Sequence, residues 1–407
     1  MNYFLRFLTG WLVFTLVLSS TSMAQEQPQA ASNTIYLPLV QQNHDSSEEI
    51  VLTQPAITIQ GTVEQVVSEF SANQLILSRA AVHVKEVIEG VFSGDRLIIR
   101  YEGGTVGDVT LRVSHQPVLA AGMELWVKLY QQANGEYVID NVDDDLTILN
   151  AEVFASFVLY PYRWQNADLP VPIRINPNNA DIAGTAEADA IRRAMDTWNT
   201  FTGSFFEFAD GGNSTCTANG TNTDDDDAIF CVVWQDSLSS GNALATTHYW
   251  FRSDQLTHID MIFWGRTTGA DTIWSTNPTG ANQFDVESVA LHEFGHALGL
   301  DHETCCDAVM NPTIGANQLK RTLRSDDHKA VTAQYTPNLT TSFVDRLAPA
   351  GNFTCTDAIR CRTVRRGVKH VADNGTVRIS PGNYPETMVI SRSMTLVSTG
   401  GVVTIGQ

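Results

Sequence analysis

Residues 292–302 read His-Glu-Phe-Gly-His-Ala-Leu-Gly-Leu-Asp-His, and this segment constrains the fold more than any other part of the chain. His292 and His296 are four residues apart, so on a helix their rings lie on one face and can hold a single ion. Gly299 can adopt the positive φ that ends a helix and turns the chain, which would bring His302 to the same point. Three neutral imidazoles with one open coordination position are typical of a catalytic zinc site.

The residues around this segment predict a buried helix. Asp285 is a candidate N-cap, and Glu287 in the first turn complements the helix dipole. Leu291, Phe294 and Leu298 occupy another face at i, i+3 and i+7, a spacing that favours burial in a core.

Glu293 follows the first histidine directly and is the candidate catalytic residue. Zinc lowers the pKa of a bound water from about 15.7 towards 7, and a carboxylate can take the proton and pass it to a leaving amine. The alternative is an amphipathic helix that carries two histidines by chance. It is disfavoured because His302, Gly299 and the downstream Met310 all fall where the chemistry requires them.

The segment resembles the His-Glu-x-x-His-x-x-Gly-x-x-His motif of the metzincin metallopeptidases, and Ala308–Pro312 resembles their Met-turn. The surrounding sequence, over roughly 160–336, is similar to the matrixin (matrix metalloproteinase-like) branch. The resemblance implies a zinc-dependent endopeptidase that acts on protein or peptide substrates, with His292, His296 and His302 as metal ligands.

The resemblance also implies roles for residues outside the motif. Met310 would form a hydrophobic floor beneath the zinc, and Asp326 or Asp327 would bind the Met-turn backbone. Ala243–Phe251 would be the edge strand that pairs with an extended peptide substrate. Ile314 stands where many matrixins have Tyr, which predicts a different S1′ pocket.

Two departures from the family concern latency and structural metals. Residues 25–215 contain no cysteine, so a cysteine switch is absent. We therefore predict activity without a thiol-reactive trigger and only a modest change on deletion of residues 25–150, although steric blocking by this part stays open. The run Asp224–Asp227 is a candidate Ca²⁺ site, with a solvated acidic loop as the favoured alternative. His248, His258 and Asp260 are spaced unlike the family's structural metal ligands, which favours ordinary strand residues.

The first 24 residues read as a signal peptide. Arg6 gives a short positive region, Phe7–Leu18 is largely apolar, and Ser22-Met23-Ala24 offers small residues for cleavage. A membrane anchor is disfavoured because the apolar run is shorter than the ~20 residues that a spanning helix needs. We therefore expect a secreted, extracellular protein that does not span the membrane.

Charge and cysteine usage agree with export. The chain has 25 basic and 45 acidic residues, a formal net charge of −20, which disfavours nucleic acid as a partner because its binding needs a basic face. All six cysteines follow residue 215, and in an exported protein they favour disulfides. Short loops favour the pairs Cys216–Cys231 and Cys355–Cys361, whereas the adjacent Cys305 and Cys306 stay ambiguous.

The pattern predicts a multidomain chain. Residues 25–55 are a polar linker, and 56–150 alternate as the short strands of a small β sandwich or barrel that resembles OB-like modules. Residues 154–336 form the zinc metallopeptidase domain, of the α/β (α+β) class, with a mixed sheet and an active-site helix. Within it, residues 171–175 read as a strand, and Thr185 can cap a helix whose apolar residues lie on one face: Ile191, Ala194, Met195 and Trp198. Residues 337–352 are a second linker.

Residues 353–407 resemble the first coil of a pectate-lyase-like parallel β-helix, with strands expected at 376–379, 388–390, 395–397 and 402–405. Such solenoids need about three repeats to bury a core, so we expect a fragment of a longer protein. The tail suggests contact with extracellular matrix or polysaccharide, and hence an alternative function: a polysaccharide-binding or polysaccharide-cleaving β-helix protein with an accessory zinc domain. The absence of suitably placed paired carboxylates in the tail disfavours it, and Glu293 argues against a zinc-binding module without turnover.

Overall fold

The computed structural model describes residues 56–406, except 72–74, 141, 150–158, 219–229, 240, 268–269, 281 and 304–307. The predicted signal peptide and first linker, the Asp224–Asp227 run and the pair Cys305-Cys306 lie outside the described residues. None of the helices in the described part has the length and apolar character needed to cross a bilayer.

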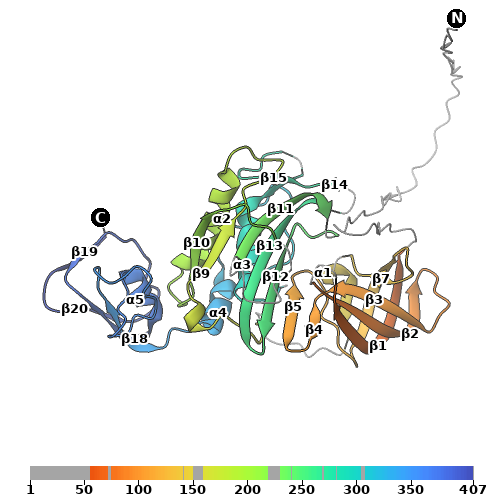
Figure 1. The fold of residues 1–407 in the computed structure, drawn as a ribbon, viewed down its shortest axis with the longest axis horizontal. Helices are drawn as coiled ribbons and strands as arrows, with labels where there is room; N and C mark the ends of the chain where they lie inside the picture. Colours follow the sequence, from red (N-terminus) through yellow and green to blue (C-terminus); the bar gives the residue numbers. More distant parts are fainter. Residues whose placement is uncertain are drawn as a thin grey trace, which may run out of the picture. The chain divides into compact units, whose positions relative to one another are not determined.

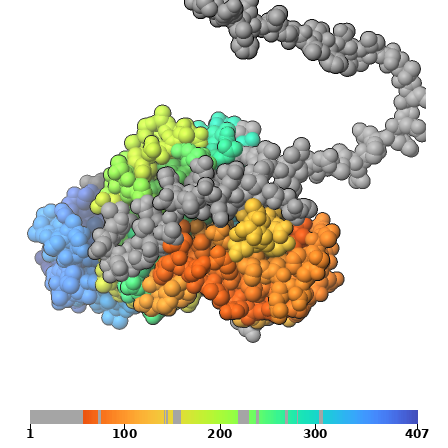
Figure 2. Space-filling view, turned by 45° about the vertical axis from the view of Figure 1, so that its right-hand side comes forward, coloured from red at the N-terminus to blue at the C-terminus, as the bar shows by residue number. Residues whose placement is uncertain are grey.

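Strands in the first part of the chain close into a small barrel (Figure 1). The strands pair in the order β1–β2–β3–β7–β6, and β6 pairs back with β1; their bounds are Ile57–Phe70, Ile76–Glu89, Arg96–Glu102, Tyr137–Val138 and Glu124–Gln131. The short helix α1 (Val142–Asp145) and strand β8 (Leu146–Ile148), which pairs with β6, complete it. The space-filling view shows this segment, coloured red to yellow, as one continuous body (Figure 2).

Gly61 allows β1 to pair on both sides. A Cβ atom at Gly61 would lie 2.7 Å from the carbonyl oxygen of His83, and the register with β2 shifts at this point. Such a bulge bends a strand and increases its twist, which barrel closure requires. Alternate residues of the strands, such as Ile59, Val82 and Leu125, are then fully buried inside.

One hairpin leaves the barrel. β4 (Gly104–Val106) and β5 (Val109–Val113) pair with each other, and β5 then pairs antiparallel with β12 (Ala245–Arg252) of a second sheet. We expected residues 56–150 to form a module of their own, and the pairing of β5 with β12 was not predicted. Strand pairing between segments so far apart leaves no local pattern in the sequence.

The second sheet is mixed, as expected for the α/β class. Its order is β10–β9–β11–β13–β12–β5–β4, with β14 beside β13; the remaining bounds are β9 Val171–Ile175, β10 Phe208–Asn213, β11 Phe230–Ser239, β13 Gln255–Thr267 and β14 Ala270–Asp271. β9 is parallel to both β10 and β11, and β11 is parallel to β13, whereas β12 is antiparallel to β13. A short 3-10 turn (Asn166–Asp168) and the parallel pair β15 (Ile273–Ser275) and β16 (Gln283–Asp285) accompany this sheet.

Helices α2 (Ala186–Thr200), α3 (Val286–Ala297) and α4 (Ser325–Gln334) contribute to the same core as this sheet (Figure 1). In α2 the predicted apolar face is confirmed, since Ile191, Ala194, Met195 and Trp198 are all buried. The indole Nε1 of Trp198 donates to the carbonyl oxygen of Leu291 at 2.9 Å, which fixes α2 against α3. Helix α2 begins after Thr185 as predicted, but without a hydrogen bond from the Thr185 side chain.

The tail has its own buried cluster and parallel strand pairing. β17 (Leu339–Val344), β18 (Val371–Ile379) and β20 (Thr395–Ser398) form one parallel sheet, and β19 (Gly382–Tyr384) pairs in parallel with β21 (Val403–Ile405). β17 lies in residues 337–352, which we expected to be a linker; its partner β18 is distant in sequence, so the pattern could not reveal the pairing. The strand expected at 388–390 is wrong, because these residues are not in a strand. The β-helix itself stays a prediction.

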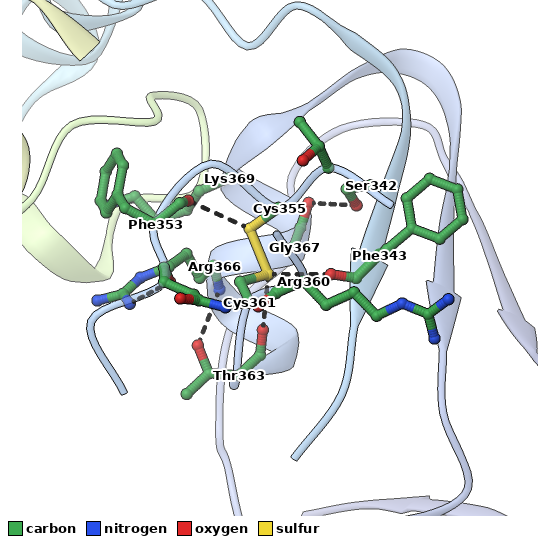
Figure 3. The surroundings of a disulfide bond; sticks show 12 residues. Ser342, Phe343, Phe353, Cys355, Arg360, Cys361, Thr363, Arg366, Gly367 and Lys369 are labelled. Carbon is green, nitrogen blue, oxygen red and sulfur yellow. Dashed lines mark hydrogen bonds between the residues drawn. A yellow bond between two sulfur atoms is a disulfide. The ribbon is translucent and has the colours of Figure 1, made fainter. Parts of the chain in front are cut away.

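Both disulfides expected from short loops are present. Cys216 bonds Cys231, and Cys355 bonds Cys361. Figure 3 shows the second bond beside helix α5 (Val364–His370), where Cys355 and Cys361 are fully buried in the tail's core.

Candidate metal centre

Helix α3 presents two histidines to one point, and the turn after it brings a third. The Asp285 carboxylate accepts from the Ser288 backbone N–H and caps the helix as predicted. Gly299 has a φ of 90°, the left-handed conformation that the turn requires. As a result His296 Nε2 lies 3.1 Å from His292 Nε2 and 3.1 Å from His302 Nε2.

Backbone carbonyls determine which nitrogens face this point. His292 Nδ1 lies 2.8 Å from the Val309 oxygen, and His296 Nδ1 lies 2.9 Å from the Leu300 oxygen. A carbonyl oxygen only accepts, so each Nδ1 carries the hydrogen and each Nε2 of a neutral ring presents a lone pair.

The convergent lone pairs fit a metal ion. Without hydrogens the Nε2 atoms of His292 and His296 cannot bond to each other, and a cation between them would satisfy both. Nitrogen ligands of a tetrahedral zinc lie about 3.3 Å apart for bonds of 2.0–2.1 Å, close to the separation observed here.

Burial favours the neutral form of His292 and His296, as metal binding requires. It lowers the pKa of His292 to about 4 and lowers the pKa of His296 well below its usual value. The neighbouring histidines add to the lowering for both rings because like charges repel.

Glu293 is buried beside this cluster. Its Oε2 accepts hydrogen bonds from the Thr247 hydroxyl at 2.7 Å and the Ser114 hydroxyl at 3.2 Å, and its Oε1 lies 3.5 Å from His115 Nε2. Burial alone would raise the pKa of this carboxyl group. The hydrogen bond with His115 opposes this effect, and on balance the pKa of Glu293 lies below its usual value.

The Met-turn is held as the resemblance implied. The Asp327 carboxylate accepts from the backbone N–H groups of Val309 at 3.0 Å and Met310 at 3.2 Å, so of the two predicted aspartates Asp327 binds the turn. A Cβ atom at Gly295 would collide with the sulfur of Met310. Met310 therefore packs directly against α3 at Gly295, which lies between His292 and His296 in the sequence.

A fourth histidine joins the cluster, and sequence reasoning missed it. His115, just after β5, offers a ring nitrogen to the group of His292, His296 and His302, in which all the ligand atoms lie within 4.8 Å of one another. No motif surrounds His115 in the sequence, so only the pairing of β5 with β12 reveals it. Across the described ranges, no second group of this kind is found.

The predicted edge strand is not an edge here. β12 covers most of Ala243–Phe251, but its outer side already pairs with β5. The residues considered as structural metal ligands lie on strands, as favoured: His248 on β12, and His258 and Asp260 on β13 with 3.4 Å between His258 Nε2 and Asp260 Oδ1.

A cavity of about 290 Å³ opens beside the cluster. Its lining includes His292, Glu293 and Leu244 together with residues of the Met-turn segment through Ile314. Ile314 therefore does border a pocket next to the metal centre, at the position where the sequence predicted a change of pocket shape.

Comparison with known proteins shows what this part of the chain is similar to. Residues 163–336 match the peptidase M10 family model, described as matrixin. Similar proteins include metalloendoproteinase 4-MMP of Arabidopsis thaliana, 38% identical over 79 residues, which are 19% of this chain and 23% of the relative. Macrophage metalloelastase of Oryctolagus cuniculus is 44% identical over 66 residues (16% and 14%), and matrix metalloproteinase-20 of Homo sapiens is 48% identical over 59 residues (14% and 12%).

The matches are confined to part of each protein. The chain spans less than a quarter of the length of these relatives. The match to the family model covers residues 163–336, which exclude the barrel and the tail.

Proposed function

Because residues 163–336 form a matrixin domain, we propose that this protein is a zinc-dependent endopeptidase that hydrolyses peptide bonds in protein or peptide substrates. The observation that carries the proposal is the meeting of the His292, His296 and His302 imidazoles at a single point, with the buried Glu293 carboxylate lining the same cavity as His292. Matrixins are zinc-dependent, and the donor set suits that ion.

His292, His296 and His302 are the proposed zinc ligands. The Nδ1 contacts of His292 and His296 to carbonyl oxygens support this role, since such contacts orient a ligand ring and fix its tautomer. The third ligand depends on Gly299, whose positive φ turns the chain back.

Glu293 is the proposed general base. A bound zinc would supply Lewis acidity and an acidified water to the site. The Glu293 carboxylate, ionised and oriented by the Thr247 hydroxyl, accepts the proton of the attacking water and then donates it to the leaving amine. Burial of Glu293 excludes bulk water that would compete for that proton.

Secretion is the second part of the proposal. It rests on residues 1–24, whose positive start, apolar run and small residues are typical of a cleaved signal peptide. N-terminal sequencing of the exported protein should begin at Gln25; a mature chain that still contains residues 1–24 would contradict it.

Metal analysis and peptide hydrolysis test the peptidase function. The purified protein should contain about one zinc per chain, and cleavage of a peptide library should stop on addition of a chelator and return with zinc. A chain that binds no zinc would contradict the ligand set, and cleavage that persists after zinc removal would contradict the mechanism.

The alternative function, a polysaccharide-acting β-helix protein, gains no support, since the comparisons match the peptidase part. Matrix or polysaccharide binding by the tail and a structural Ca²⁺ stay predictions.

A further inference from the structure

We propose that residues 110–115 inhibit this enzyme from within: β5 occupies the strand edge at which a substrate would pair, and His115 is the fourth ligand of the metal. The inference rests on the proposed function. It replaces the expectation that a chain without a cysteine switch is active from the start.

The first support is the strand pairing. Thr110, Leu111, Arg112 and Val113 pair antiparallel with Phe251, Trp250, Tyr249 and His248 on β12. Next to this ladder the Ser114 backbone N–H donates to the Thr247 oxygen at 2.9 Å, and the Thr247 N–H donates to the Ser114 hydroxyl at 2.7 Å. An extended peptide needs these same backbone groups to add itself to the sheet, so β5 excludes it.

The second support is the position of the His115 ring. Its centroid lies 4.7 Å from that of His302, 5.7 Å from that of His292 and 6.0 Å from that of His296. The three proposed ligands are separated from one another by 4.8–5.2 Å. His115 therefore extends the cluster to four donors, the number that fills a tetrahedral zinc and leaves no position for water.

The third support is the state of the general base. Glu293 Oε2 accepts from the Ser114 hydroxyl, and Oε1 faces His115 Nε2 at 3.5 Å. Ser114 and His115, which directly follow β5, thus contact both oxygens of the Glu293 carboxylate. These oxygens would otherwise contact the attacking water.

The backbone at His115 makes this segment an inhibitor rather than a substrate. His115 has a φ of 59°, and the Gln116 N–H donates to the Val113 oxygen at 3.3 Å, so the chain turns back at the metal centre. A substrate that adds itself to the edge of the sheet is extended where it crosses the metal. The left-handed conformation is uncommon for a residue with a side chain and tends to occur where function demands it.

Metal spectroscopy on the full chain tests the fourth ligand without measuring activity. X-ray absorption of the zinc-loaded wild type should show four imidazole nitrogens, and the His115→Ala variant should show three with an oxygen in the fourth position. His83→Ala removes a histidine of the barrel outside the cluster and should leave four. Three imidazoles and an oxygen in the wild type would overturn the inference while leaving the proposed function intact.

Activity of the same proteins tests inhibition. His115→Ala should raise kcat/KM on a short peptide by about tenfold or more, because a tethered segment competes at an effective concentration in the millimolar range. An unchanged kcat/KM in the zinc-loaded variant would overturn the inhibitory role. A variant with three imidazoles that cleaves no peptide of the library would overturn the proposed function.

The His115→Cys variant tests whether position 115 reaches the metal, including the case in which His115→Ala folds poorly. A thiolate is also a zinc ligand, so this variant should stay inhibited and should gain activity on treatment with a thiol-reactive reagent. With Co²⁺ in place of zinc it should show a sulfur-to-metal charge-transfer band that the wild type lacks. Absence of that band would mean that position 115 does not reach the metal.

Discussion

At the scale of the residue, two backbone carbonyl oxygens determine which ring nitrogens of the α3 histidines are available to a metal ion. The oxygens of Val309 and Leu300 hold the Nδ1 atoms, so both Nε2 lone pairs meet at one point. The spacing of His292 and His296 could be predicted from the sequence, because helix geometry alone puts them on one face. The tautomers of the two rings could not be predicted. The Val309 carbonyl belongs to the Met-turn, which contacts His292 only in the folded chain.

His302→Ala should remove most of the bound zinc, because it takes away one of the three proposed ligands. Among the described residues, His115 is the only further member of this histidine cluster that could replace it. Zinc affinity should fall by at least about 10–100-fold, the range seen when even supporting partners of a ligand are lost. Competition with a chromophoric chelator measures it. An affinity equal to that of the wild type would show that His302 is not a ligand.

Glu293→Gln should keep zinc and fold but lower kcat by about 10²–10⁴-fold, because the amide retains the shape of the side chain and cannot take a proton. The measurement is best made in the His115→Ala background, where the metal is accessible to substrate. Turnover close to that of the background protein, with zinc bound, would assign the base to another residue.

At the scale of the element, Asp327 joins the start of α4 to the Met-turn. Its carboxylate accepts from the backbone N–H of Arg324 at 2.7 Å as well as from Val309 and Met310. One side chain thereby caps a helix and satisfies two buried donors of a distant loop. The aspartate pair was predictable from the family resemblance, whereas the choice between Asp326 and Asp327 depended on which one points inward.

Asp327→Ala should destabilise the protein by about 2–4 kcal/mol, since it leaves buried N–H groups without an acceptor and removes a cap. Urea unfolding followed by tryptophan fluorescence measures the change. Asp326→Ala is the matched control: Asp326 pairs with Lys329 near the surface, so its loss should cost about 1 kcal/mol or less. Equal effects of the two substitutions would contradict this role.

At the scale of the whole molecule, the barrel, residues 163–336 and the tail each have a buried apolar cluster, and specific polar contacts join the tail to the part of the chain before it. On the tail side, helix α5 supplies the buried Lys369, whose Nζ donates to the backbone oxygens of Asn199 at 2.8 Å and Phe206 at 2.5 Å. Arg366 pairs with Glu207 at 2.6 Å beside it. Burial lowers the pKa of Lys369 to about 8, and Glu207 opposes the lowering.

Lys369→Met should destabilise the protein by about 3 kcal/mol, because it leaves two buried carbonyl oxygens without donors and Glu207 with one cation fewer. Thermal unfolding of the full chain measures it. Lys329→Met, at an exposed lysine of α4, should change stability by no more than about 0.5 kcal/mol. A Lys369→Met protein as stable as this control would mean that the tail is not anchored by its buried lysine.

The sequence by itself determined the zinc-binding helix, the strand β9, the apolar face of α2 and the two short disulfide loops. In each case the interacting residues are near neighbours, so helix and strand periods or a short loop suffice to bring them together. Only the tertiary structure decided that β17 belongs to the tail's sheet, that 388–390 is not a strand, and that β12 already has a partner. It also brought His115 to the metal centre. These outcomes depend on pairing between segments far apart in the chain, and a lone histidine after a short strand has the same local pattern whether it faces solvent or a metal.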